Sequence, residues 1–280
     1  VAGTLMVIGM ITLALFAGIV GSTLMGSVLS MREEYFRMSN YLDHIIICGY
    51  EPGSRMLLDT LEQELDLDAH TVVIFAPYER PTDIPSEFMW VQGDPTKESE
   101  LHKVRLPYAD AAIVVGSRQE MPQHADGRTI LIAFTLRRFL KQQAETVRQR
   151  RHPLYIVAEI LDAENVEHAR TAGADEVIQT TRMGFSLLAH AVEVHGTATL
   201  VGELADVSGD SLFVDPIPSD LPEPLTFRSV AQALKERHGV LVVGVRRPGL
   251  EDLLNPSDEL ALTHEHSVIY IAARSMLPSS

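Results

Sequence analysis

Six short, mostly apolar runs recur over the first 180 residues, and they constrain the fold more than any other feature of the sequence. Continuous apolar runs are typical of strands that are buried on both faces of a parallel sheet. Helical stretches lie between the runs, so the sequence predicts an α/β fold with a doubly wound parallel sheet. The expected strands are 44–48, 71–76, 88–91, 111–115, 154–158 and 176–178.

The first expected strand stops at a glycine, and the chain restarts as a helix: His44-Ile-Ile-Ile-Cys-Gly-Tyr-Glu-Pro-Gly-Ser-Arg. Gly49 would allow a sharp turn, Gly53 would let a phosphate approach backbone N–H groups, and Ser54 would cap a helix whose dipole favours anions. This pattern indicates a nucleotide-binding loop. Glu51 stands where the fingerprint G-x-G-x-x-G has its second glycine, so a turn kept only for folding is the alternative. The candidate ligand residues here are Gly49, Tyr50, Glu51, Gly53, Ser54 and Arg55.

Further polar residues follow the later strands and would meet the glycine loop at one crevice, because ligands of such sheets bind outside the carboxyl ends of the strands. The second strand runs into Ala76-Pro77-Tyr78-Glu79, without an acidic residue directly at its end to hold an NAD ribose. We therefore expect an adenine nucleotide or NAD(H) as a regulatory ligand of modest affinity, with a divalent cation at Asp94 and Glu159 as its candidate companion. The candidate residues along this edge are Asp94, Thr96, Ser117 and Glu159.

The sequence argues against two classes of function. No His or Lys stands at a strand end beside an activatable nucleophile, so a non-enzyme is expected and an NAD(P)-dependent oxidoreductase is the weaker alternative. The formal net charge of −15 argues against a nucleic-acid partner, since phosphate backbones are bound by clustered Lys and Arg. The single cysteine, Cys48, is expected to be a small buried residue in a reducing compartment, which favours the cytoplasm for this region.

The chain begins with a stretch free of charge from Val1 to Met31. About twenty apolar residues cross the hydrocarbon core of a bilayer, so residues 1–30 predict a transmembrane helix and residues 31–43 a linker. A signal peptide is the competing interpretation, but it lacks a basic start and a cleavage site. Small residues recur at every fourth position and form one face that would let another helix approach closely: Ala14, Gly18, Ser22 and Gly26. The abrupt start favours a longer parent protein.

The helical stretch 128–140 is apolar on more faces than one sheet would cover, which predicts a subunit interface. The stretch 183–192 predicts a helix that leaves the domain and takes part in the same self-association. From Leu200 the pattern changes to short strands at 212–214, 240–245 and 268–272, with a helix at 230–236, which is typical of a small α+β domain. The expected domains are therefore 44–180, a crossover helix at 181–199, and 200–277.

Four stretches together resemble the RCK (TrkA-N) domain: His44-Ile-Ile-Ile-Cys-Gly-Tyr, Gly93-Asp-Pro-Thr96, Ala158-Glu159 with Asn165-Val-Glu167, and Ala172-Gly-Ala-Asp-Glu-Val177. The segment 200–273 resembles the TrkA-C domain that usually follows it. The resemblance implies a Rossmann-like fold for 44–180, and the first helix is similar to the inner pore helix of prokaryotic RCK-gated potassium channels.

The resemblance implies a ligand-gated potassium channel subunit: a homotetramer in a prokaryotic plasma membrane, with a cytoplasmic gating ring and K⁺ as the permeant ion. A membrane-anchored regulatory subunit or tail of a Trk/Kef-type transporter is the alternative. In calcium-gated members of the family, carboxylates at positions matching Asp94, Glu159 and Leu161 hold the ion. Because leucine at 161 removes one ligand and Ca²⁺ prefers six or more oxygens, calcium gating through this site is not expected.

Overall fold

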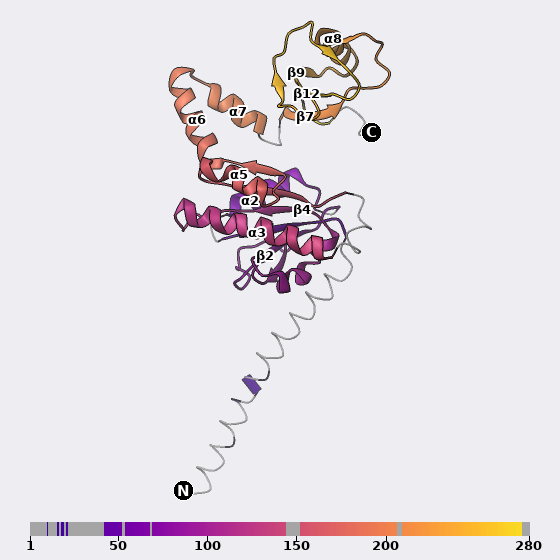
Figure 1. Cartoon of the computed structure of the whole chain (residues 1–280). Coiled ribbons are helices and arrows are strands. Elements are labelled where there is room, and N and C mark those ends of the chain that lie inside the picture. Colours follow the sequence, from indigo (N-terminus) through magenta and orange to yellow (C-terminus); the bar gives the residue numbers. More distant parts are fainter. Residues whose placement is uncertain are drawn as a thin grey trace. The chain divides into compact units, whose positions relative to one another are not determined.

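The computed structural model describes residues 42–51, 54–67, 69–143, 152–205 and 209–275, together with residues 10, 16, 18, 19 and 21. It divides into two compact units, Val1–Gly184 and Phe185–Ser280 (Figure 1). The transmembrane helix expected at 1–30 and the linker at 31–43 lie almost wholly outside the described residues. No helix within the described ranges has the length and apolar character needed to span a bilayer.

The first unit is built on a six-stranded sheet in the order β3-β2-β1-β4-β5-β6. Every neighbouring pair is parallel, which confirms the predicted parallel, Rossmann-like sheet. The strand order reverses between β1 and β4, so the switch point where such sheets bind ligands lies at the carboxyl ends of these two strands. The strands are β1 His44–Cys48, β2 Val72–Ala76, β3 Met89–Gln92, β4 Ala109–Val114, β5 Tyr155–Glu159 and β6 Glu176–Ile178.

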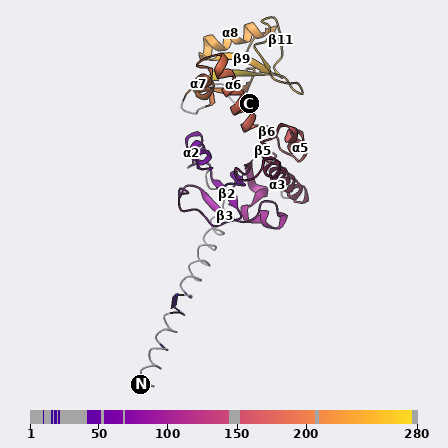
Figure 2. The same cartoon turned by 90° about the vertical axis from the view of Figure 1, so that its left-hand side faces the viewer.

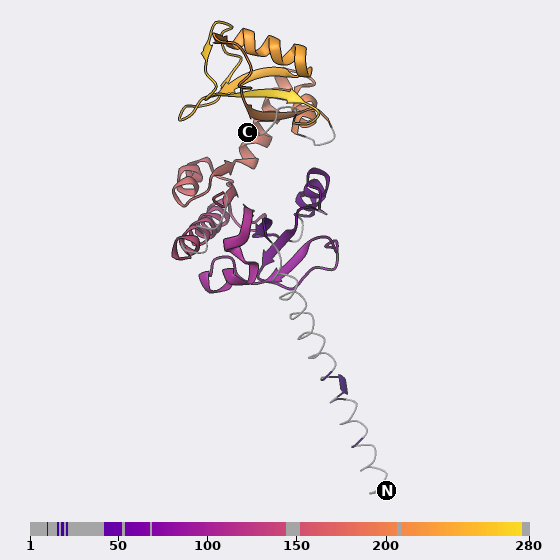
Figure 3. The same ribbon diagram turned by 90° about the vertical axis from the view of Figure 1, so that its right-hand side faces the viewer.

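Alternate side chains of the strands serve two cores, one on each face of the sheet. Ile46 and Cys48 of β1 join one core with residues of α3 (Pro122–Gln142) and α5 (Val166–Thr171). Ile47 joins the other core with Leu58 of α2 (Arg55–Glu64). Figures 2 and 3 show α2 on one side of the sheet and α3 with α5 on the other. Burial on both faces explains why the central strands β1 and β2 are almost entirely apolar.

The connections differ from the expected alternation of strand and helix at two places. The segment from β2 to β3, residues 77–88, forms turns without a helix. It carries Pro77, Pro81 and Pro85, and each proline lacks the N–H that a helix interior needs. Between β3 and β4 the chain forms only the 3₁₀ helices η1 (Glu98–Val104) and η2 (Leu106–Tyr108). A third, η3 (Ala163–Asn165), precedes α5.

The helix α6 (Thr180–Glu193) runs across the boundary between the two units, and α7 (Thr197–Ala205) follows it. The second unit contains an antiparallel sheet in the order β10-β9-β12-β7, and α8 (Phe227–His238) contributes to its core (Figure 1). Three of its strands and α8 cover the stretches predicted from the sequence. The strands of this unit are β7 Ser211–Pro216, β8 Leu225–Thr226, β9 Leu241–Arg246, β10 Leu253–Leu254, β11 Ala261–Leu262 and β12 Ser267–Ala272.

Candidate functional site

The turn after β1 requires a glycine for two independent reasons. Gly49 has a φ of +81°, in the left-handed region that side chains disfavour. A Cβ atom at this position would also lie 2.6 Å from the carbonyl oxygen of Val115. The close approach exists because the Val115 N–H donates to the Cys48 carbonyl at 2.9 Å, which extends the pairing of β1 with β4. Gly49 thus turns the chain at the switch point, as predicted; Gly53 lies outside the described residues.

The start of α2 differs from the prediction in its polar contacts. Ser54 occupies the position before the helix, but its side chain makes no capping hydrogen bond. The Arg55 guanidinium donates to Asp59 at 2.7 Å and to the carbonyl of Asp83 in the loop after β2. The Arg55 side chain is thus engaged by its own helix and by the neighbouring loop.

Glu159 lies at the carboxyl end of β5, is buried, and is the most heavily engaged acidic side chain of this edge. Its Oε2 accepts the backbone N–H of Gly116 at 3.0 Å. Its Oε1 accepts both the hydroxyl of Thr180 at 2.6 Å and the guanidinium of Arg118. One cation and two neutral donors therefore satisfy the buried carboxylate, in keeping with the rule that buried charges are paired and hydrogen-bonded.

Arg118 joins three strand ends and was missed from the sequence. Its side chain pairs with Glu159, and its backbone N–H donates to Glu51 at 3.2 Å. The contacts Glu51–Arg118–Glu159 thus run across the carboxyl ends of β1, β4 and β5. Its neighbour Ser117, a predicted site residue, is buried and accepts the Gln119 N–H at 3.2 Å, which shapes the turn. The sequence did offer a signal for Arg118, since it is a cationic residue directly after the predicted site residue Ser117.

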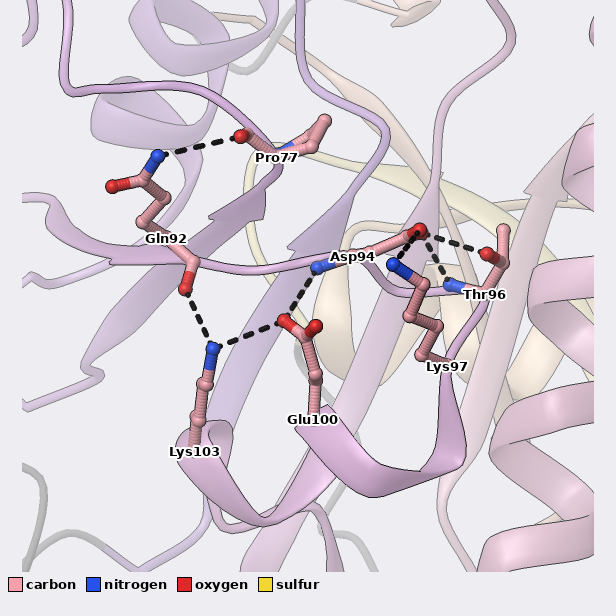
Figure 4. A network of polar contacts seen from close by, with 7 residues as sticks. All are labelled: Pro77, Gln92, Asp94, Thr96, Lys97, Glu100 and Lys103. Atoms are coloured by element: carbon pink, nitrogen blue, oxygen red, sulfur yellow. Dashed lines mark hydrogen bonds and ion pairs between the residues drawn. The ribbon is translucent and has the colours of Figure 1, made fainter.

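Asp94 and Thr96 form a self-contained turn after β3 (Figure 4). Asp94 Oδ1 accepts the backbone N–H of Thr96 at 3.0 Å and its hydroxyl at 2.7 Å. The other carboxylate oxygen faces the Lys97 ammonium at 3.4 Å. Burial raises the pKa of Asp94, but the Thr96 hydrogen bonds and Lys97 outweigh it and leave the pKa below its usual value. Both oxygens therefore have protein partners.

A second layer of polar contacts supports the Asp94 turn, and Figure 4 shows it below the strand. Glu100 accepts the Asp94 N–H at 3.0 Å and the Lys103 ammonium at 3.0 Å. The hydrogen bond from Lys103 is the main reason that the pKa of Glu100 lies below its usual value. Lys103 also donates to the carbonyl of Gln92 at 3.3 Å, and the Gln92 amide reaches the carbonyl of Pro77 at 3.4 Å.

These contacts bear on the metal expected at Asp94 and Glu159. Asp94 is paired with Lys97 and Glu159 with Arg118, so each carboxylate already faces a cation of the chain. Leu161 offers its backbone N–H to Asp126 and has no side-chain oxygen. Across the described residues, no group of three or more His, Cys, Asp or Glu side chains is arranged to hold a metal ion. The donor set therefore does not fit a Ca²⁺ ion, which wants six or more oxygens.

Tyr50, another predicted site residue, lies in the core on the α2 face. Its ring is 1% exposed and meets Trp90 edge-on, with 6.0 Å between ring centroids. Tyr78 contacts the same indole at 5.7 Å, and burial raises its pKa to about 12. The Tyr78 hydroxyl is buried and has no hydrogen-bond partner within the described part of the chain. Aromatic packing therefore fills the space behind the glycine turn.

Asp126 is a second residue that the sequence-based reasoning missed. It lies on α3, is 0% exposed, and accepts hydrogen bonds from the loop after β5. The donors are the N–H groups of Leu161 at 2.8 Å and Asp162 at 2.9 Å, and the side-chain amide of Asn165 at 2.8 Å. Asp126 therefore fixes the loop that begins directly after Glu159. The available signal was an acidic residue on a stripe whose other members, Thr129 and Ala133, are buried.

Comparisons with known proteins agree with this architecture. Residues 40–166 match the family model of the calcium-activated potassium channel slowpoke-like RCK domain. The calcium-gated potassium channel TvoK of Thermoplasma volcanium is 24% identical over 198 residues, which cover 69% of this chain and 53% of the relative. This chain thus spans about half the length of that relative.

One solved structure shows the same fold. The human SLO3 gating ring aligns with a TM-score of 0.61 at 15% identity, covering 82% of this chain and 44% of that one. The GsuK channel bound to NAD aligns at 21% identity over 83% of this chain and 37% of that one, but its TM-score of 0.40 is too low to bear on the ligand of this protein. Residues 40–166 of this chain are thus similar to the slowpoke-like RCK domain of calcium-activated potassium channels.

Proposed function

We propose that the chain is the regulatory region of a ligand-gated potassium channel subunit, in which residues 1–30 form a pore-lining helix. The observation that carries the proposal is the slowpoke-like RCK domain at 40–166, built on a parallel sheet with charged residues at its switch point. The subunits form a homotetramer in a prokaryotic plasma membrane, with the RCK region in the cytoplasm, and the protein catalyses no reaction.

The proposed ligand is an adenine nucleotide or NAD(H) at the carboxyl ends of β1, β4 and β5. Three features support it: the position at the switch point, the N-terminus of α2, and the cationic Arg118. Two features lower its affinity. Glu51 repels a phosphate, and Pro77 and Tyr78 supply no carboxylate for a ribose. Modest affinity is therefore expected, in keeping with a sensor that responds to changes in ligand concentration.

Ligand binding would open or close the pore through differential affinity. A ligand shifts a conformational equilibrium only by as much as it prefers one state over the other. Coupling of about 1 to 3 kcal/mol per site is typical of allosteric proteins. In a homotetramer, four such sites act on one pore, so a modest preference at each site is sufficient.

The test combines flux and binding. Rubidium uptake is measured in potassium-loaded vesicles that contain the protein, with ATP, ADP, AMP, NAD or NADH on the cytoplasmic side. We expect uptake that one of these nucleotides changes severalfold, while adenosine, which lacks the phosphate, has no effect. Calorimetric titration of the 280-residue chain should give heats with the same nucleotide. The proposal fails if uptake is absent, or if no nucleotide changes it up to millimolar concentration. Turnover of NADH would support the oxidoreductase alternative instead.

A further inference from the structure

We infer that Arg118 binds the phosphate of the ligand and that Glu159 pairs with Arg118 when no ligand is bound. The hydroxyl of Thr180, at the start of α6, responds when Arg118 exchanges one partner for the other. The inference rests on the proposed function, because it takes a phosphate-bearing ligand as given. It adds an internal competitor to the site. The guanidinium of Arg118 is bound either by the carboxylate of Glu159 or by the phosphate of the ligand.

The ion pair is built so that one partner can move and the other cannot. The side chain of Glu159 is only 10% exposed and is fixed by the Gly116 N–H and the Thr180 hydroxyl. The side chain of Arg118 is 53% exposed and lies on the loop after β4. Among the described residues, Glu159 is the only side chain that its guanidinium contacts. The remaining N–H groups of the guanidinium are therefore open to a second acceptor.

Electrostatics at the edge makes the exchange necessary for an anion to bind. A phosphate near the glycine turn meets the carboxylates of Glu51 and Glu159. Among the described residues, Arg118 pairs with Glu159 through its guanidinium and donates to Glu51 through its backbone N–H. Arg55, at the start of α2, is occupied by Asp59 and the Asp83 carbonyl. A guanidinium binds a phosphate through two parallel hydrogen bonds, which makes phosphate a strong competitor for it. The Arg118 side chain is 53% exposed, so the guanidinium can turn to a phosphate at the surface, while the buried Glu159 carboxylate keeps two neutral donors, the Gly116 N–H and the Thr180 hydroxyl.

The exchange changes the hydrogen bonding of α6 because two donors share one oxygen. Oε1 of Glu159 accepts both Arg118 and the hydroxyl of Thr180, the first residue of α6. When the guanidinium leaves, the buried carboxylate retains only the Gly116 N–H and the Thr180 hydroxyl. Its bond to Thr180 then strengthens, because a buried charge depends on its remaining donors. Ligand binding should therefore tighten the first turn of the helix that leads into the second unit.

The first test is a binding cycle with ADP on the 280-residue chain, followed by calorimetry. Arg118→Ala should weaken ADP binding about tenfold, as expected for the loss of hydrogen bonds to a charged group. Arg118→Lys keeps the charge but loses the paired geometry, and should fall between wild type and alanine. Glu159→Gln should tighten binding about tenfold by releasing the guanidinium. Arg170→Ala is the matched control, since Arg170 forms an exposed pair with Glu167 on α5 and should leave ADP binding unchanged.

The double variant separates the competition from a general charge effect. If Glu159 acts by holding Arg118, the gain from Glu159→Gln disappears in the Arg118→Ala background. If Glu159 merely repels the ligand, the gain persists there, and the inference is overturned. Adenosine serves as the second probe, and its binding should not respond to Arg118, because it carries no phosphate.

The second test is hydrogen exchange at the first turn of α6, residues 180–183. ADP should slow exchange of these amides severalfold in the wild type. Thr180→Val, which removes the hydroxyl, should abolish that slowing while ADP still binds. Unchanged exchange on ADP binding to the wild type would overturn the coupling to α6. The measurement also serves where Glu159→Gln fails to fold, since it needs only wild type and Thr180→Val.

The outcomes separate this inference from the proposed function. If wild type binds ADP and Arg118→Ala binds equally well, the nucleotide site stands and the inference is wrong. A second outcome is that Glu159→Gln binds ADP when Arg118 is present but the wild type does not. This result supports the competition of Glu159 for Arg118 and rejects ADP sensing by the wild type. If none of the variants binds ADP up to millimolar concentration, the inference is rejected; the proposed function is rejected with it only if ATP, AMP, NAD and NADH also give no heat.

Discussion

Asp126 offers the sharpest test of how the site is held in place. We expect Asp126→Ala to unfold the first unit far more easily than a typical surface substitution would. The carboxylate is fully buried and satisfies the N–H groups of Leu161 and Asp162 together with the amide of Asn165. Alanine removes the acceptor and leaves these donors on the loop after β5 without their partner.

The magnitude follows from the number and type of these bonds. A hydrogen bond to a charged group contributes about 1.5 to 3 kcal/mol, so the three bonds give an upper bound of roughly 9 kcal/mol. The burial cost of the carboxylate is removed at the same time, and the loop donors regain water once the loop opens. We therefore expect a loss of about 3 to 4 kcal/mol in the free energy of unfolding. Asp126→Asn keeps one accepting oxygen and should lose about 2 kcal/mol.

The assay is urea unfolding followed by tryptophan fluorescence. The chain has one tryptophan, Trp90, which is 2% exposed in the core of the first unit, so the signal reports this unit alone. The matched control is Asp110→Ala, an exposed aspartate on β4, which should change stability by less than about 0.5 kcal/mol. A loss below about 1 kcal/mol for Asp126→Ala would refute the reasoning, because the three bonds would then contribute no more than surface contacts do.

Three further predictions concern other parts of the same unit. Gly49→Ala should cost about 2 to 3 kcal/mol in urea unfolding, because of its φ of +81° and the contact with Val115, whereas Gly127→Ala on the open face of α3 should stabilise slightly. Burial raises the pKa of the Cys48 thiol to about 12, so Ellman's reagent at pH 8 should label only unfolded chain. Because the folded state prefers the neutral thiol, this contribution to stability is fully present below about pH 9 and is lost as the pH rises toward 12. Phe134, exposed on α3, should contribute to self-association, so Phe134→Asp should lower the sedimentation coefficient while Gln123→Asp on the same helix should not; a wild-type chain that sediments as a monomer at micromolar concentration would contradict the interface.

The sheet could be predicted from the sequence because its strands are buried on both faces. Runs such as Val72 to Ala76 are apolar at every position, and their short length and β-branched residues favour a buried strand over a buried helix. β6 was located at the residues that the structure assigns to it, Glu176–Ile178. The sequence also indicated that residues 77–88, between β2 and β3, would not form a helix, since Pro77, Pro81 and Pro85 interrupt any helical pattern there.

The polar contacts of the site could not be predicted in the same way. Arg118, and not Arg55, forms the ion pair across the strand ends, because Arg55 already pairs with Asp59 on its own helix. The spacing of residues along the sequence does not determine this choice. Thr180 reaches Glu159 across 21 residues of sequence, and Asp126 reaches Asp162 across 36. Such pairs become visible only when β4, β5 and α3 are placed side by side.

The contact between Lys103 and Gln92 has a consequence for how the protein behaves at high concentration. β3 is an outer strand of the sheet, and outer strands with free backbone groups invite pairing with a second molecule. Here the Lys103 ammonium takes up the Gln92 carbonyl at the end of a strand of four residues. A short strand whose end is covered by a lysine is a poor template for a foreign strand. Lys103→Ala should therefore favour slow aggregation by edge-to-edge pairing before it affects ligand binding.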